Sequence, residues 1–86
     1  MLNRKIEMNY NFNENDKLLT IFMTDTSENS VIKHAIEYDI DDFRNENRVN
    51  LYNRILVDLD AEYDDELANV IELITEKIIN NVIEQI

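Results

Sequence analysis

The strongest constraint on the fold is a strict alternation of apolar and polar residues near the start of the chain. Apolar residues occur at every second position, namely Ile6, Met8, Tyr10 and Phe12. A spacing of two places all four side chains on one face of an extended strand. The pattern therefore predicts a β-strand with one buried face and one solvated face.

A second apolar run, Leu18 to Thr24, follows the four polar residues 13–16. If those four residues form the loop of an antiparallel hairpin, apolar residues of the two strands share one face. The expected pairs are Phe12 with Lys17, Tyr10 with Leu19, Met8 with Ile21 and Ile6 with Met23. Only the pair beside the loop breaks the match, and a slip of one residue would destroy it. We predict a hairpin with this register.

The middle of the chain fits two interpretations. Residues 31–43 and 49–59 both carry apolar residues at spacings that suit a helix and a strand alike. Joined as strands through a loop at residues 44–47, they would match apolar residues on one face: Ile40 with Leu51, Ile36 with Ile55, His34 with Val57 and Ile32 with Leu59. Opposite charges would meet on the other face, which also favours strand pairing. We predict a second hairpin here, with a helix over about residues 41–59 as the alternative.

The last third of the chain has the clearest helical pattern. Acidic residues precede it, where the helix dipole favours negative charge. A stripe with helical spacing follows: Leu67, Val70, Ile71, Ile74 and Ile78. A second apolar flank consists of Leu73, Ile79, Ile83 and Ile86. We predict a helix from about Asp64 to Ile86, whose wide apolar band is either covered by a curled sheet or contacts a second copy or a partner.

Together these elements predict one α+β domain over residues 1–86. Its small antiparallel sheet has two hairpins and up to four strands, and the C-terminal amphipathic helix packs on one face. We expect that face to carry Met8, Tyr10, Ile21, Ile36 and Ile55. A single domain is what 86 residues allow, and 44% hydrophobic with 31% charged residues is typical of a folded, soluble chain.

The composition excludes several kinds of active site. The chain has no glycine, which excludes Gly-rich phosphate loops, and no cysteine, which excludes disulfides and thiolate metal sites. His34 is the only histidine and lies on the predicted inward face, where we expect a partly buried or sheet-edge residue and not a catalyst. The only serines, Ser27 and Ser30, lie in a predicted loop. Acids at alternate positions from Asp58 resemble a calcium loop, but Tyr63 occupies the position that needs glycine. We expect no catalytic residue, metal or cofactor.

The charge balance indicates the kind of partner. Nineteen acidic residues against eight basic ones give a formal charge of −11, which disfavours direct binding to nucleic acid or to an anionic membrane. Such a chain attracts a basic protein surface, although acidity alone also maintains solubility. The candidate partner-binding residues form two clusters on one elongated rim, at opposite ends of the second predicted hairpin. They are Asp39, Asp41 and Asp42 in one cluster and Asp58, Asp60, Glu62, Asp64 and Asp65 in the other. Tyrosines 10, 38, 52 and 63 are candidate anchors.

In size, acidity, lack of cysteine and abundance of Asn and Ile, the whole chain resembles the small inhibitors encoded by phages and mobile elements. These include anti-CRISPR proteins and DNA mimics. The resemblance implies a non-enzymatic, stoichiometric inhibitor that occupies the basic nucleic-acid-binding surface of a host defence protein, such as a CRISPR effector or a nuclease, in the host cytoplasm. The alternative is a homodimeric regulatory or structural protein assembled through the Ile-rich C-terminal helix.

Overall fold

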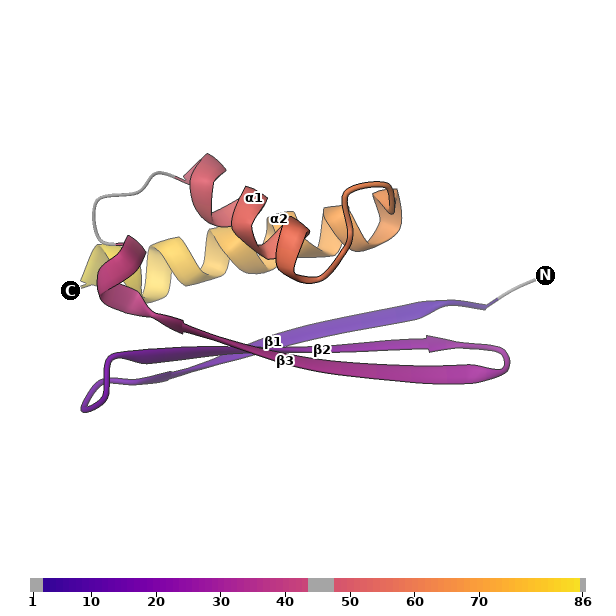
Figure 1. The fold of residues 1–86 in the computed structure, drawn as a ribbon, viewed down its shortest axis with the longest axis horizontal. Helices are drawn as coiled ribbons and strands as arrows, with labels where there is room; N and C mark the ends of the chain where they lie inside the picture. The colour runs from indigo at the N-terminus through magenta and orange to yellow at the C-terminus, as the bar shows by residue number, and fades with distance from the viewer. Residues whose placement is uncertain (1–2, 44–47, 86) are drawn as a thin grey trace.

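The computed structural model describes residues 3–43 and 48–85. One antiparallel sheet and two helices form two layers, with both helices on the same face of the sheet (Figure 1). The elements in order are β1 (Lys5–Asn13), β2 (Leu18–Ser27), β3 (Ser30–Asp39), the 3₁₀ helix η1 (Ile40–Phe43), α1 (Arg48–Asp58), α2 (Asp65–Asn81) and the 3₁₀ helix η2 (Ile83–Gln85). The molecule is elongated, 44 × 23 × 18 Å. The predicted α+β class is confirmed.

The β1–β2 hairpin forms as predicted, but its register differs by two positions. Met8 pairs with Met23 and Tyr10 with Ile21, so the loop comprises residues 14–17 and not 13–16. The side-chain oxygen of Asn13 accepts hydrogen bonds from the backbone N–H groups of Asn15 and Asp16, which starts the turn one residue later. Because a shift of two keeps each side chain on its face, the predicted inner face of β1 is correct.

The third strand pairs with β2, where the sequence pattern had favoured pairing with residues 49–59. Ile36 lies opposite Ile21, and the strand order is β1-β2-β3. The polar stretch before β3 belongs largely to the two strands, which run up to Ser27 and resume at Ser30. The hydroxyl oxygens of these two serines lie 2.9 Å apart and close the turn.

The predicted second hairpin is wrong, because residues 48–58 form the helix α1. Its buried residues Leu51 and Ile55 are followed by the buried Leu59 at the same spacing of four. Residues four apart lie on the same face of a strand, whose side chains alternate with a period of two. They also lie on the same face of a helix, which has 3.6 residues per turn, so this spacing fits a strand and a helix alike. The alternative helix over residues 41–59 covers η1 and α1, while the predicted loop at residues 44–47 lies outside the described residues.

The helix α2 begins where the acidic residues predict and ends earlier than expected. Asp64 is its N-cap, and the Asp64 carboxylate accepts a hydrogen bond from the backbone N–H of Leu67 at 3.2 Å. The α-helix ends at Asn81, and η2 follows in place of a continuous helix toward residue 86. At seventeen residues it is the longest helix in the described part of the chain, and none there is both long and apolar enough to cross a membrane.

The core lies between the sheet and the two helices. Met8, Tyr10, Ile21 and Ile36 face the helices as predicted, whereas Ile55 joins this core from α1. The centre of the core is fully buried and includes Leu19, Ile21, Ile55, Ile71 and Ile78. On the same face of the sheet, His34 is exposed on the edge strand β3, although Met23 opposite it on the central strand is buried. Of the two positions expected for His34, partly buried or at the edge of the sheet, the second is correct, because His34 lies on the edge strand β3.

Two residues of α2 provide a matched test of this packing. Ile71 is fully buried, and Leu73, two positions later, is 63% exposed. We expect Ile71→Ala to lower the free energy of unfolding by about 2–5 kcal/mol, since it leaves a cavity in the core. Leu73→Ala is expected to change it by less than about 0.5 kcal/mol. Urea unfolding followed by circular dichroism measures both, and equal losses would contradict the observed orientation of α2.

Candidate acidic interaction surface

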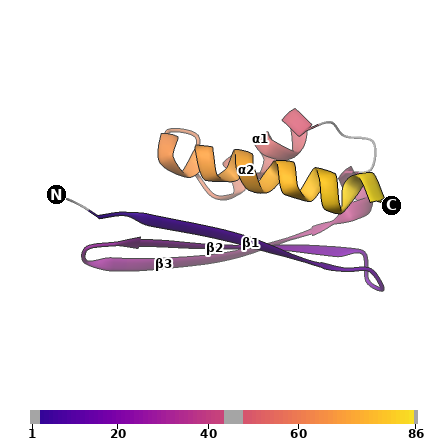
Figure 2. The ribbon, with the colours of Figure 1, turned by 180° about the vertical axis from the view of Figure 1, so that it is seen from behind.

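The acidic residues singled out from the sequence gather at opposite ends of the helical layer. The connection cluster comprises residues around the α1–α2 connection: Asp58, Asp60, Glu62, Asp64, Asp65 and Glu66. The η1 cluster comprises Asp39, Asp41 and Asp42. In Figure 1 the orange connection lies toward the end near the N-terminus and η1 toward the end near the C-terminus, and Figure 2 agrees. The two clusters are therefore separated, but not by the second hairpin on which the expectation rested, because the helix α1 spans part of the distance.

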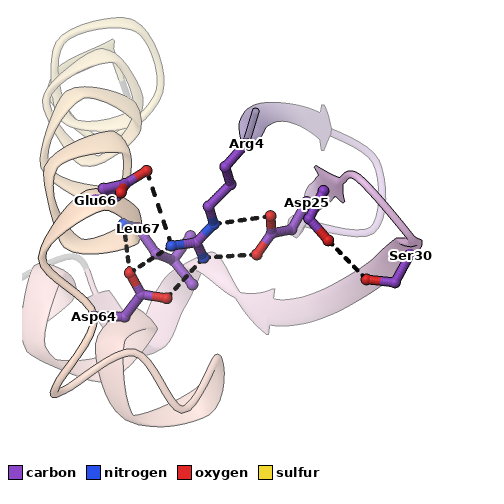
Figure 3. A network of polar contacts seen from close by, with 7 residues as sticks. Arg4, Asp25, Ser30, Asp64, Glu66 and Leu67 are labelled. Carbon is purple, nitrogen blue, oxygen red and sulfur yellow. Dashed lines mark hydrogen bonds and ion pairs between the residues drawn. The ribbon is translucent and has the colours of Figure 1, made fainter. Parts of the chain in front are cut away.

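Asp64 is held inside the fold by Arg4. The guanidinium of Arg4 donates to both carboxylate oxygens of Asp64, at 2.9 and 2.7 Å, and to both oxygens of Asp25, at 3.0 and 2.6 Å (Figure 3). Two-pronged pairs of this kind are stronger than single hydrogen bonds. The contacts join the residue before β1, the central strand β2 and the N-cap of α2. Asp64 therefore has a structural role.

The Arg4 contacts also shift the pKa values of the residues that make them. Hydrogen bonds from Arg4 lower the pKa of Asp64, and the backbone N–H of Leu67 acts in the same direction. The two carboxylates in turn raise the pKa of Arg4. Sequence reasoning had missed Arg4. The sequence does contain a signal for it: Arg4 is two residues before Ile6, so an extended chain places its cation on the same inner face of the sheet. A cation on that face requires a carboxylate partner.

Asp58 is also engaged within the fold. Its carboxylate accepts a hydrogen bond from the buried Tyr38 hydroxyl at 2.5 Å, which links the end of α1 to β3. The Tyr38 ring packs edge-to-face against Phe43, with ring centroids 5.2 Å apart, and Arg54 lies 5.6 Å above the Phe43 ring. Burial raises the pKa of Tyr38, and the bond to Asp58 raises it further. Asp58 thus stabilises the junction between layers.

The remaining acids of the connection cluster point to solvent. Asp60, Glu62 and Asp65 are exposed, and within residues 3–43 and 48–85 they make no ion pair. Arg4, the base that approaches Glu66 at 4.0 Å, is already bound by two other carboxylates. Asp60 also has a backbone φ of 53°, in the left-handed region that non-glycine residues rarely occupy. This connection therefore combines concentrated negative charge with an unfavourable backbone conformation.

The η1 cluster is smaller and partly engaged. A side-chain oxygen of Asp39 accepts a hydrogen bond from the backbone N–H of Asp41 at 3.0 Å, which supports the start of η1. Asp41 also lies 3.8 Å from the Lys17 amine. Asp42 is exposed. The negative charge at this end of the molecule is therefore lower and partly balanced.

The candidate tyrosine anchors differ in accessibility. Tyr63 is 99% exposed and lies between the acids of the connection cluster. Tyr38 belongs to the core, and Tyr10 and Tyr52 pack against it. Only Tyr63 of the four tyrosines therefore remains a candidate anchor for a partner.

Two further features of the described residues concern metal binding and grooves. They contain no group of three or more His, Asp or Glu side chains placed to hold a metal ion. A groove of about 390 Å³ lies between β1 and α2. It is lined by Ile6, Glu7, Met8, Asn9, Val70, Leu73, Ile74 and Lys77. Its one acid, Glu7, pairs with Lys5 at 2.8 Å on the same strand, which balances the charge there.

No protein family, curated protein or solved structure matches this chain. Its function must therefore be inferred from the chemistry of the surface described above.

Asp64 allows a test of the Arg4 contacts through pH. Because its pKa is lowered in the folded state, its contribution to stability is present above the ordinary value of about 3.8 and is lost as pH falls through the lower folded value. Asn also caps helices well, so Asp64→Asn removes mainly the charge. We expect this variant to lose about 1 kcal/mol at pH 7 and to show a flatter decline below pH 4.

The neighbouring exposed Asp65 supplies the control. Asp65→Asn makes the same chemical change without breaking the Arg4 contact, and we expect its acid unfolding curve to follow wild type. Urea unfolding between pH 3 and pH 7 measures both variants. Identical pH profiles for Asp64→Asn and wild type would show that the pair with Arg4 does not stabilise the fold.

Proposed function

We propose that this protein is a non-enzymatic inhibitor that binds the basic nucleic-acid-binding surface of another protein, such as a CRISPR effector or a nuclease. The observation that carries the proposal is the exposed part of the connection cluster, in which Asp60, Glu62 and Asp65 have no basic partner among the described residues. A basic surface would supply the missing positive charge and would be attracted over long range.

The local cost of the connection cluster supports a role in binding. Carboxylates close together repel one another, and a left-handed backbone at Asp60 adds to that cost. One acid at the N-cap is sufficient to start α2, and Asp64 already serves there. Acids spread over the surface would provide the same solubility with less repulsion. A cationic partner would relieve the repulsion and so explain the concentration of charge.

The shape of the molecule supports mimicry of a nucleic-acid strand. A charge of −11 over a longest dimension of 44 Å is about one charge per 4 Å. A nucleic-acid strand carries about one phosphate per 3.4 Å. The charge density is therefore close to that of a single strand and well below that of a duplex. A groove that follows one strand is the partner surface that fits best.

Within this proposal the acidic residues have different roles. The connection cluster provides the main contact through Asp60, Glu62, Asp65 and Glu66, with Tyr63 as an apolar anchor. The η1 cluster provides a secondary contact through Asp39 and Asp42. Asp58 and Asp64 act through the fold, because Tyr38 and Arg4 hold them in place.

The test neutralises only exposed acids. We expect the triple variant Asp60→Asn, Glu62→Gln, Asp65→Asn to bind its partner at least tenfold more weakly and with a lower salt dependence. The control neutralises three scattered exposed acids, Glu14→Gln, Glu28→Gln and Glu84→Gln, and so has the same net charge. We expect it to bind much more like wild type, because the connection cluster makes the direct contact, whereas the total charge contributes long-range attraction.

The measurement has two stages. The immobilised wild-type chain is exposed to bacterial lysate at low salt, and proteins eluted by a salt gradient are identified by mass spectrometry. Each retained nucleic-acid-binding protein is then loaded with fluorescent single-stranded DNA, and displacement by each variant is followed by anisotropy. Retention of no such protein, or equal displacement by both triple variants, would contradict the proposal.

A further inference from the structure

The outer edge of β3 is the most exposed regular element of the described chain. β3 is an edge strand of ten residues, and eight of them are exposed. It pairs with β2 without a bulge, and the chain has no proline, so its outer backbone groups are available along the whole strand. The strand lies at the front of the sheet in Figure 1. An edge of this length is a template for another strand.

Exposed apolar side chains gather on and beside this strand. Val31 is 58% exposed and Ile32 48%, and Phe22, at 46%, lies opposite Ala35 on the neighbouring strand. By contrast, the apolar residues of the other edge strand, β1, are partly buried under α2. The sheet therefore leaves its main uncovered apolar surface at β3.

The charges of β3 identify its partner as a second copy of the same strand. We propose that two copies pair antiparallel through β3, with the two-fold axis at Ala35. Lys33 and Glu37 are equally distant from Ala35 in the sequence, so each Lys33 then lies opposite Glu37 of the second copy. Neither residue makes an ion pair among the described residues of one copy. The arrangement forms two ion pairs and one continuous six-stranded sheet.

The same register also suits the apolar residues. Ile32 lies opposite Tyr38 of the second copy, and Ala35 opposite Ala35, with Phe22 next to Ala35 in each copy. Phe22 and Ala35 of both copies therefore form one apolar row across the axis on the face of the sheet without helices, whereas Ile32 and Tyr38 lie on the face that carries the helices. An axis at Lys33 or at Glu37 would place like charges opposite each other. The axis at Ala35 is the register that pairs Lys33 with Glu37.

The other edge of the sheet fits a second copy less well. In β1 the neighbouring Lys5 and Glu7 already pair with each other, at 2.8 Å. Leu73 of α2 is exposed and lines the β1–α2 groove, but Ile79 and Ile83, which belong to the same predicted apolar flank, pack against the core. The hypothesis of a dimer through the C-terminal helix is therefore weaker than one through β3.

Charge reversal tests this interface. Lys33→Glu or Glu37→Lys alone would place like charges opposite each other at two points, and we expect each to raise the dimer dissociation constant at least tenfold. The double variant restores both pairs with reversed signs and keeps the net charge of the wild type. We expect its dissociation constant to return within about threefold. Lys5→Glu on β1 is the matched control and should leave the dimer intact.

Disulfide trapping tests the register independently. The chain has no cysteine, so a single introduced cysteine can form disulfides only between copies. Directly opposite residues of antiparallel strands have Cβ atoms about 4.5–5.5 Å apart, close to what a disulfide needs. We expect Ala35→Cys to crosslink rapidly. Val31→Cys, on the same face, should not, since the two copies of residue 31 would lie about 26 Å apart.

Sedimentation velocity from about 1 to 500 µM gives the dissociation constants, and non-reducing gels give the crosslinking rates. A dimer that weakens in each single variant and recovers in the double variant, with crosslinking confined to Ala35→Cys, supports the proposal. A wild-type chain that is monomeric over the whole range overturns it. A dimer that is insensitive to Lys33→Glu but lost in Leu73→Asp also overturns it, and would place the interface at the groove between β1 and α2.

Discussion

The need to cover the apolar face of a three-stranded sheet governs the arrangement of the whole molecule. β2 is the central strand, and its inner residues Leu19, Ile21 and Met23 are buried. The outer two backbones of a three-stranded sheet lie about 10 Å apart, and side chains make the sheet face wider, so one helix about 10 Å wide leaves part of that face uncovered. α2 covers the β1 side, and α1 completes the cover on the side of β3 (Figures 1 and 2). The second helix is therefore a requirement of the sheet.

This requirement explains which elements the sequence could predict. The alternation of Ile6, Met8, Tyr10 and Phe12 fits only a strand, and the stripe from Leu67 to Ile78 fits only a helix, so both were predicted correctly. Residues 51, 55 and 59 are four apart and satisfy both periods. Arg54 and Asp58, which were expected to meet Glu37 and Lys33 across the strands, are also four positions apart and lie on one face of α1. Only the position of α1 over the sheet resolves the choice.

The sequence showed which acidic residues make up the candidate site, but it did not show the role of each one. The density of acids around residues 58–66 was evident, and the two clusters lie at opposite ends of the helical layer. That Asp58 binds Tyr38 and Asp64 binds Arg4 depends on contacts between residues 20 and 60 positions apart, which no local pattern contains. The register of the first hairpin was missed for a smaller reason, since the Asn13 side chain moves the turn by one residue.

The same contacts separate the acids that stabilise the fold from those that do not. Arg4 neutralises the charge of Asp25 and Asp64. The exposed carboxylates of the connection cluster, including that of the left-handed Asp60, lie on the connection between the two helices. The repulsion between these carboxylates and the left-handed backbone at Asp60 do not disturb the packing of the core. The capped N-terminus of α2 and the buried residue Leu59 after α1 hold the connection at both ends. A fold that tolerates concentrated charge at one point, while it pairs or disperses charge elsewhere, satisfies the physical requirement for an electrostatic contact surface.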